Sequence, residues 1–480
     1  MLFNSIDFAV FFPIFFVIYW IVAKKLTLRN VFLLAASYLF YGWWDWRFLF
    51  LIIFSSFVDF SIGQKIYNST NKSTRKKYLL LSLLINLGLL AYFKYTNFFI
   101  DSFVNSFRLF GTEMDSFTLH IILPVGISFY TFQTLSYTID IYRERLKPTK
   151  DWLSFFTFVA FFPQLVAGPI ERASHLLPQF FKTYNFEYKA FKSGLLLIAF
   201  GLFKKMVIAD RLAIVVNEVY NNPTGHSGQD LIIATIFFAF QIYCDFSGYS
   251  DIAIGIARTL GFDLMKNFNT PYFSTSITEF WRRWHISLST WFRDYVYIPL
   301  GGSRNGEYRT YFNLFLVFVI SGLWHGAAIT FIIWGAIHGI IIVIEKALSK
   351  TPLKVTSKHL IPSLFFALFT FAIVCFAWIF FRANSFSDSV YIVKHLVDFA
   401  PDYNNYYNLG LPKHEFILAI VVIGLLLIFD ATHRRYNSLR LLNKTNIIVR
   451  CAVYAFIIYS IVIFGIYGND SVSEFIYFQF

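Results

Sequence analysis

A histidine inside an apolar stretch is the first candidate for chemistry. His325 lies near the middle of residues 310–344, which are 35 residues without Asp, Glu, Lys or Arg. A neutral imidazole can take the proton from a hydroxyl group while that oxygen attacks a thioester, and a dry site keeps the imidazole neutral. The pattern therefore suits acyl transfer with His325 as general base. Ser321 lies one helical turn earlier and can equally be a packing hydroxyl, so direct transfer is simpler than a serine intermediate.

The residues around His325 also predict a break in the helix. One continuous helix over residues 310–344 would be about 52 Å long, whereas the hydrocarbon core of a bilayer is roughly 30 Å thick. Gly322 and Gly326 remove side chains beside His325 and Trp324, which allows a substrate or a second helix to approach closely. The alternative interpretation is a buried histidine that bonds to a backbone carbonyl at a helix-packing site.

A second unusual segment, residues 279–295, combines tryptophans, arginines and His285. Read as one helix, it is amphipathic and suits the membrane interface. His285 lies at the edge of the aromatic face, where it can point into the protein. The predicted faces are an aromatic one with Trp281, Trp284, Leu288, Trp291 and Tyr295, and a polar one with Arg282, Ser289 and Arg293.

The arginines of this segment have two interpretations. They can contact lipid phosphates while the tryptophans form an aromatic belt. Alternatively, Arg282 or Arg283 can bind the phosphates of a soluble donor such as coenzyme A, because arginine binds phosphate in a bidentate manner.

Two acids and one interrupted segment complete the unusual residues. Asp245 and Asp251 lie in a run flanked by apolar sequence, where an acid needs a partner. We expect that partner to be an arginine near residue 282, in an ion pair that is structural more often than catalytic. Pro and Gly residues within 162–169 predict an interrupted, re-entrant segment, because broken backbone at membrane depth is tolerated only inside protein or beside a wet cavity.

The composition says what kind of protein must position these residues. Of the 480 residues, 57% are apolar, 21% are aromatic and 14% are charged, compared with roughly 25% charged in soluble domains. Much of the surface must therefore face lipid. The net charge of +13 does not indicate nucleic-acid binding, because the basic residues form short clusters between apolar runs. The three cysteines indicate no disulfide framework or metal site, and no bound cofactor is predicted.

The apolar stretches predict an all-α, polytopic integral membrane protein with about ten to twelve transmembrane helices. Re-entrant and interfacial pieces complete a single membrane domain over residues 1–480. Some stretches are short, and some are long enough for two passes. They lie near residues 8–23, 30–44, 48–64, 78–97, 121–142, 152–170, 189–209, 230–262, 310–344, 361–381, 415–430 and 447–468.

Basic residues follow every second span in the first third of the chain, at 24–29, 65–77 and 143–150. The stretch between the last two clusters, residues 98–118, carries Asp101, Arg108, Glu113 and Asp115 instead. Because basic loops stay in the cytoplasm, the N-terminus is predicted outside.

Taken together, the chain resembles the membrane-bound O-acyltransferases, specifically the bacterial branch that acetylates exported alginate. Each short motif is weak alone, but their order along the chain is specific. The motifs are Phe3–Ser5, Pro124–Phe129, Leu165–Ile170, Tyr243–Ser250, Phe280–Tyr295, Ser321–Ala327 and Phe475–Phe480.

The resemblance implies a helical core around a central channel, in the cytoplasmic (inner) membrane of a bacterium. Acetyl-CoA is the implied donor substrate, and the implied acceptor is a polysaccharide reached through a periplasmic or membrane-anchored partner. The family's essential histidine corresponds to His325 and its second histidine to His285. The candidates for substrate binding are Arg282, Arg283, Asp245, Ser321 and Trp324.

Two alternatives stay open at this point. The acceptor can be peptidoglycan, or teichoic acid with D-alanyl as the acyl group. A polysaccharide export channel is the non-enzymatic alternative, although a channel would carry paired charges through several spans, whereas this chain concentrates its unusual residues around His285 and His325.

Overall fold

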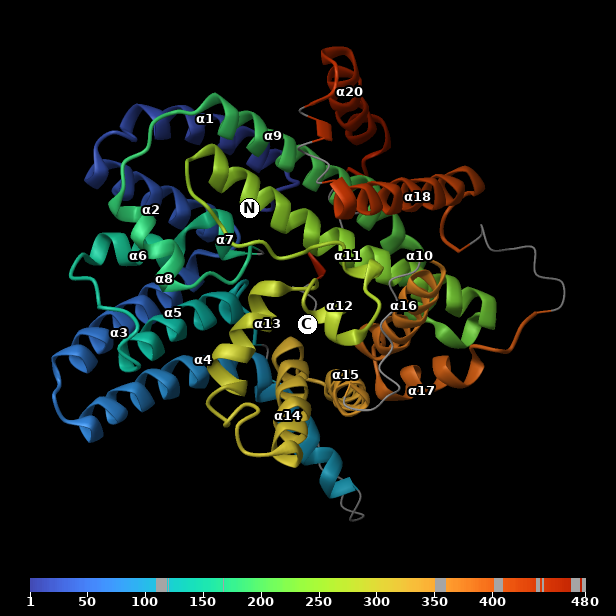
Figure 1. Cartoon of the computed structure of the whole chain (residues 1–480), viewed down its shortest axis with the longest axis horizontal. Helices are drawn as coiled ribbons and strands as arrows, with labels where there is room; N and C mark the ends of the chain where they lie inside the picture. The colour runs from blue at the N-terminus through green and yellow to red at the C-terminus, as the bar shows by residue number, and fades with distance from the viewer. Residues whose placement is uncertain are drawn as a thin grey trace. The chain divides into compact units, whose positions relative to one another are not determined.

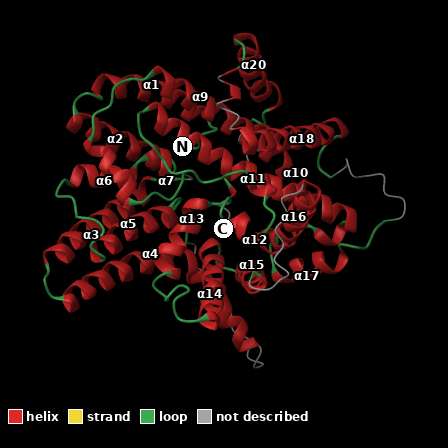
Figure 2. Cartoon of the chain, in the orientation of Figure 1, coloured by secondary structure: helices red, strands yellow, loops and turns green. Residues whose placement is uncertain are grey.

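In the computed structural model, helices joined by loops and turns make up the described part (Figure 2), and none of the described residues forms a strand. The described residues are 1–108, 119, 121–166, 168–349, 360–400, 409–436, 441–442, 444–467 and 475–476. Ala167, the acidic loop residues Glu113 and Asp115, and Tyr477–Phe480 of the last motif lie outside them.

The chain divides into two compact units. Figure 1 labels the helices of both units and colours them by residue number. The first contains residues 1–198 and 252–265, and the second contains 199–251 and 266–480. The prediction of a single membrane domain stays a prediction. Helices of the first unit are α1 (Ile6–Val22), α2 (Leu26–Gly42), η1 (Trp46–Phe48), α3 (Leu49–Asn68), α4 (Lys72–Arg108), α5 (Ile127–Tyr142), α6 (Trp152–Ala160), α7 (Phe162–Leu165), α8 (Ala173–Leu176), η2 (Leu177–Phe181) and most of α9 (Tyr188–Leu202).

The second unit contains the end of α9 and most of the long helix α11, which continues into the first unit. Its helices are η3 (Phe203–Ala209), α10 (Asp210–Asn221), η4 (Pro223–Gly225), α11 (Gly228–Thr259), η5 (Pro271–Phe273), α12 (Ile277–Trp281), α13 (Ile286–Phe292), η6 (Arg293–Tyr297), α14 (Glu307–His325), α15 (Ile329–Leu348), α16 (Leu360–Arg382), α17 (Phe386–His395), α18 (Lys413–Tyr436) and α20 (Ile447–Phe464).

Among the described residues, seven helices are long and apolar enough to cross a membrane, and α1 is a shorter apolar helix. This confirms a polytopic membrane protein, while the count of ten to twelve crossings and the central channel stay predictions. The stretch near 230–262 forms one helix, α11, not two passes. The seven helices are Trp46–Asn68, Lys72–Val104, Gly228–Thr259, Ile329–Leu348, Pro362–Arg382, Lys413–Tyr436 and Ile447–Phe464.

In the first unit, a buried acid within an apolar helix joins two neighbouring helices. Asp59 on α3 accepts hydrogen bonds from Ser82 Oγ at 2.6 Å and from Asn86 Nδ2 at 2.9 Å, both on α4. Such side-chain bonds hold helices together where lipid supplies no hydrophobic drive between them.

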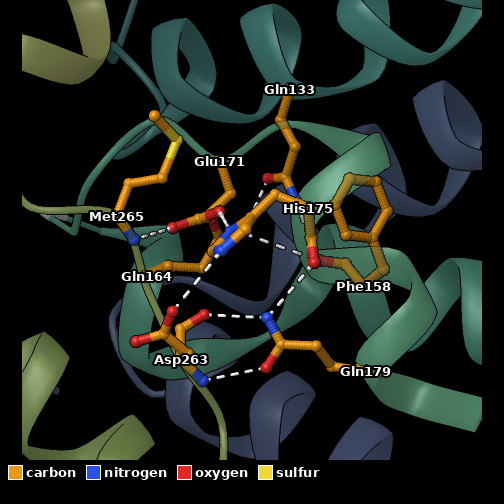
Figure 3. A network of polar contacts seen from close by, with 8 residues as sticks. All are labelled: Gln133, Phe158, Gln164, Glu171, His175, Gln179, Asp263 and Met265. Atoms are coloured by element: carbon orange, nitrogen blue, oxygen red, sulfur yellow. Dashed lines mark hydrogen bonds and ion pairs between the residues drawn. The ribbon is translucent and has the colours of Figure 1, made fainter.

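The expected interruption near residue 165 is present in the first unit. Helix α6 ends at Ala160, the short α7 covers Phe162–Leu165, and helix resumes only at Ala173. Glu171, in the non-helical part, is buried and bonds to His175 Nδ1 at 2.7 Å and to Met265 N at 2.5 Å (Figure 3).

The same network ties the interrupted segment to the loop that follows α11. Gln179 and Asp263 exchange two hydrogen bonds, with Gln179 Nε2 donating at 2.9 Å and Gln179 Oε1 accepting at 2.8 Å (Figure 3). The bond to Glu171 raises the pKa of His175. This loop then continues along the chain into residues 266–276, which belong to the second unit.

The predicted break at His325 is confirmed. Helix α14 ends at His325 and α15 begins at Ile329. The two helices pack closely in the second unit, because Gly322 lies against the carbonyl oxygen of Phe331, and Gly335 lies against that of Phe318. The glycines therefore bring the backbones together at the turn that carries the histidine.

We expect Gly322→Ala to separate α14 from α15, because the added methyl group would overlap the Phe331 carbonyl oxygen. The free energy of unfolding should fall by about 1–3 kcal/mol, measured as a lower thermal unfolding midpoint in detergent. Gly424→Ala on α18 is the matched control, since its methyl group would meet nothing within 4 Å. An equal midpoint for the two variants would contradict this account of the packing.

The prediction of one amphipathic helix over 279–295 is wrong. The segment forms two short helices, α12 and α13, and His285 between them adopts a left-handed backbone conformation with φ 42°. Both helices are anchored from elsewhere: Glu345 of α15 accepts from Ile277 N at 2.6 Å, and Ile286 N donates to the carbonyl oxygen of Asn267 at 2.9 Å. Because Ile286 N bonds Asn267 and not a carbonyl oxygen of the preceding turn, the helix is interrupted at His285.

The aromatic belt interpretation is also wrong, because the tryptophans of this segment point into the protein. Trp281, Trp284 and Trp291 are all buried. The ring centroid of Trp284 lies 5.3 Å from that of Trp378, and that of Trp281 lies 5.6 Å from that of Trp334. The stripe of tryptophans is therefore part of the core of the second unit.

Candidate active site

The two histidines singled out from the sequence lie together in the second unit. Their ring centroids are 6.4 Å apart. His285 has no solvent exposure and His325 is 3% exposed. His325 is the last residue of α14 and His285 is the N-cap of α13, so both stand at the end of a helix.

Aromatic side chains enclose this pair of histidines. Trp324 lies beside both rings, with its ring centroid 4.9 Å from that of His325 and 6.2 Å from that of His285. The rings of Trp334 and Phe381 lie 5.1 Å and 5.4 Å from His325. The site is therefore poor in water around both imidazoles.

The ring of His285 also contacts helix α11. Its ring meets that of Phe246 edge-on at 4.6 Å. Burial lowers the pKa of His285, which lies between α12 and α13 outside the seven apolar helices. A neutral imidazole in such surroundings can accept a proton from a hydroxyl group.

Asn267, which the sequence analysis did not single out, holds His285 in place. It is fully buried, and its Oδ1 lies 3.1 Å from His285 Nδ1 and accepts from Ser287 Oγ at 2.9 Å. Its Nδ2 donates to Ser250 Oγ on α11 at 3.2 Å. The loop after α11 thereby fixes both the ring and the backbone of His285.

The two arginines that the sequence suggested for substrate binding are both at least partly exposed. Arg282 is exposed. Arg283 is half-buried and forms an ion pair with Glu279 at 2.9 Å, and its Nη1 donates to the carbonyl oxygen of Asn269 at 3.2 Å. Arg434 approaches the same carboxylate at 3.6 Å. The contacts of Arg283 therefore stabilise α12, whereas Arg282 is accessible to a ligand from solution.

Asp245 and Asp251 have positively charged partners, as expected, but the prediction that these partners are arginines is wrong. Lys205 of η3 lies 2.8 Å from Asp245 and 2.7 Å from Asp210, and Lys204 lies 2.6 Å from Asp251. Lys204 and Lys205 stand in the apolar stretch 189–209, and two lysines at such a place were the sequence signal that could have identified them.

Asp245 is also a structural acceptor for the end of the chain. Its Oδ2 accepts from the backbone N–H of Ile476 at 2.7 Å, and the ring of Phe475 packs 4.5 Å from that of Tyr249. Both carboxylate oxygens of Asp245 are therefore engaged by protein groups, which supports a structural role over substrate binding.

Ser321 and Trp324 occupy the last turn of α14 together with His325. Both are buried. Trp324 contacts both histidine rings, whereas Ser321 lies one turn before His325 in a packed helix. Trp324, Trp334 and Phe381 thus form the walls around His325, and the sequence suggested only the first of the three.

These features define a polytopic membrane protein, helical in its described part, in which two buried histidines meet in an aromatic enclosure. A family of enzymes with that description matches the chain. The membrane-bound O-acyltransferase family covers residues 143–386, a range that contains both histidines, and the chain belongs to this family. It is therefore an O-acyltransferase.

Individual relatives are similar over most of their length. A protein of Pseudomonas putida named probable alginate O-acetylase AlgI is 44% identical over 390 residues, which is 80% of this chain and 78% of the relative. The peptidoglycan O-acetyltransferase of Helicobacter pylori is 38% identical over 428 residues, 83% of this chain and 80% of the relative. The teichoic acid D-alanyltransferase of Bacillus subtilis is 28% identical over 280 residues, 56% and 70% of the two chains.

Proposed function

We propose that this protein moves an acetyl group from cytoplasmic acetyl-CoA across the membrane towards hydroxyl groups of an exported polysaccharide, as in the acetylation of alginate. The observation that carries the proposal is the buried pair His285 and His325 in one aromatic enclosure. The 44% identity to a probable alginate O-acetylase supports the acetyl group and the polysaccharide acceptor.

In the proposed reaction, His325 acts as general base. Its neutral imidazole takes the proton of the acceptor hydroxyl, the oxygen attacks the thioester carbonyl, and the C–S bond breaks. The imidazolium then returns the proton to the departing thiolate, so the products are an ester and free coenzyme A. No net proton is consumed, which suits a site with little water. His285 is the second catalytic histidine of the proposal.

The donor end of the site includes Arg282 in this proposal. We expect Arg282→Gln to raise the KM for acetyl-CoA about 10-fold, because one charge-assisted hydrogen bond to phosphate is lost. The KM for the acceptor should not change. Initial rates in membrane vesicles, measured once at varied acetyl-CoA and once at varied acceptor concentration, give the two constants.

Arg283→Gln provides the comparison, since Arg283 is held by Glu279. Its main effect should be on protein stability. An unaltered donor KM in Arg282→Gln would mean that Arg282 only anchors the segment at the membrane surface.

The remaining parts of the proposal concern cellular context. The protein lies in a bacterial cytoplasmic membrane with its N-terminus outside, as the basic loops predict. A periplasmic or membrane-anchored acetyltransferase partner completes transfer to the polysaccharide.

A second acceptor, peptidoglycan, is favoured by the 38% identity to a peptidoglycan O-acetyltransferase. The test is to analyse the esters on the cell-surface glycans of a strain from which the protein has been deleted. Loss of O-acetyl esters from an exported polysaccharide supports the leading proposal, and loss from peptidoglycan supports the second. Loss of D-alanyl esters from teichoic acid would indicate another acyl group, and loss of the polymer itself would indicate an export channel.

A further inference from the structure

The structure fixes which nitrogen of His285 carries the proton. Asn267 Oδ1 lies 3.3 Å from the backbone nitrogen of Ser287, which can only donate, so the atom at that position must be the amide oxygen. The same oxygen lies 3.1 Å from His285 Nδ1. Because an oxygen that can only accept faces Nδ1, the proton of the neutral ring is on Nδ1.

The consequence concerns the other ring nitrogen. With Nδ1 protonated, Nε2 holds the lone pair. This atom is buried, and the ring that carries it lies 6.4 Å from that of His325, centroid to centroid. The carbonyl oxygen of Asn267 also accepts from Ile286 N at 2.9 Å, which holds the left-handed conformation of His285 in place. One asparagine therefore controls the tautomer of His285 and the direction of its ring.

From these contacts we infer that Asn267 is a positioning residue of the acyl-transfer reaction, which acts by keeping the proton of the neutral His285 ring on Nδ1, so that Nε2 can accept a hydrogen bond or a proton during the reaction. The inference rests on the proposed function, because it takes His285 as part of the reaction centre. It goes beyond that function by assigning a role to a residue 18 positions away in the chain.

The electrostatic surroundings of His285 make this inference testable by pH. Among the described residues, His325 is a titratable group whose ring lies against that of His285. On the neighbouring turn of α11, Asp245 is paired with Lys205 of η3. Asn267 contributes no charge, so a carboxylate at position 267 introduces a new anion against His285 Nδ1 with little change in shape.

We expect Asn267→Asp to move the acid limb of the pH–rate profile upward by about 1–3 pH units, the size of shift that an adjacent opposite charge produces. The sign follows because the new carboxylate stabilises the imidazolium and raises the pKa of His285, so the neutral ring is lost at a higher pH. At alkaline pH the variant should keep most of its activity. Asn267→Ala, which removes the acceptor, should lose up to about 10²-fold in rate at every pH.

The measurement is transfer of radiolabelled acetyl groups from acetyl-CoA to alkali-labile esters of the surface glycan, in permeabilised cells over a range of pH. Asn313→Asp on α14 is the matched control, because Asn313 is equally buried but bonds the carbonyl oxygens of Leu300 and Gly302. It should lower protein yield without moving the acid limb.

The outcomes separate the inference from the function on which it rests. Coincident acid limbs for Asn267→Asp and the wild type, with His325-dependent transfer intact, overturn the inference alone. Absence of transfer from acetyl-CoA in the wild type overturns the proposed function and the inference with it. If Asn267→Asp does not accumulate, Asn267→Ser restores an oxygen acceptor. Activity of Asn267→Ser above that of Asn267→Ala then supports the inference, and wild-type activity in Asn267→Ala overturns it.

Discussion

His325→Ala should abolish measurable acyl transfer while leaving the amount of protein in the membrane unchanged. Removal of a general base costs about 10²- to 10⁴-fold in rate, and an alanine leaves no other proton acceptor in the last turn of α14. The effect on folding should be smaller, because His325 ends its helix and does not lie within it. Ester content of the surface glycan and an immunoblot of the membranes measure the two quantities.

A histidine outside this pair, in the same unit, serves as the control for the His325→Ala variant. His338 on α15 is fully buried, and its Nδ1 accepts a hydrogen bond from Trp281 Nε1 at 3.3 Å. His338→Gln disturbs the same aromatic cluster, since the ring of His338 lies 5.1 Å from that of Trp334, but it leaves the pair of histidines in place. We expect most of the transfer activity to remain. Normal acetylation in His325→Ala at normal protein levels would exclude His325 as the base.

Lys205→Met should lower the free energy of unfolding by about 3–5 kcal/mol, the cost of removing one partner from a buried ion pair. Lys205 bridges Asp210 and Asp245, and all three side chains are at most 4% exposed. Methionine keeps the length of the side chain but leaves two buried carboxylates without their lysine. The thermal unfolding midpoint of the purified protein in detergent measures the loss.

The neighbouring lysine provides a matched comparison. Lys204 pairs with Asp251, whose side chain is 26% exposed and can be stabilised by solvent. Lys204→Met should therefore cost less than Lys205→Met, because exposed charges depend less on a protein partner. The loss of unfolding free energy in Asp245→Asn should lie between those of the two lysine variants. Lys205 still has Asp210 as a partner, and the amide oxygen can still accept from Ile476 N. Equal thermal midpoints for the two lysine variants would contradict the expectation that the more buried ion pair is the more costly one to break.

The sequence by itself determined the membrane architecture and the place of the central histidine. Apolar runs of span length predict helices, because a backbone inside lipid must satisfy its own hydrogen bonds. The break at His325 also followed from local information, since residues 310–344 are too long for one crossing and Gly322 permits a close turn. These features depend on the composition of one stretch at a time, which a sequence displays directly.

Local information was misleading where distant residues compete with it. Residues 279–295 have a helical pattern, yet the backbone on either side of His285 bonds outside the segment. Asn269 N donates to the carbonyl oxygen of Arg283 and Ile286 N donates to that of Asn267, which hold a left-handed turn at His285. One interpretation placed the tryptophans at the membrane surface, but their size suits the core equally well. Spacing alone does not distinguish a face that meets lipid from one that meets another helix.

Only the tertiary structure decided which residues meet. It placed Asn267 against His285, Lys205 against Asp245, and Trp334 and Phe381 against His325. The sequence showed that Asp245 needs a partner, since an isolated charge is costly in an apolar interior, but not that a lysine 40 positions earlier supplies it. The physical reason is that hydrogen bonds and ion pairs act over about 3–4 Å in space, whereas the pattern of a sequence records only neighbours along the chain.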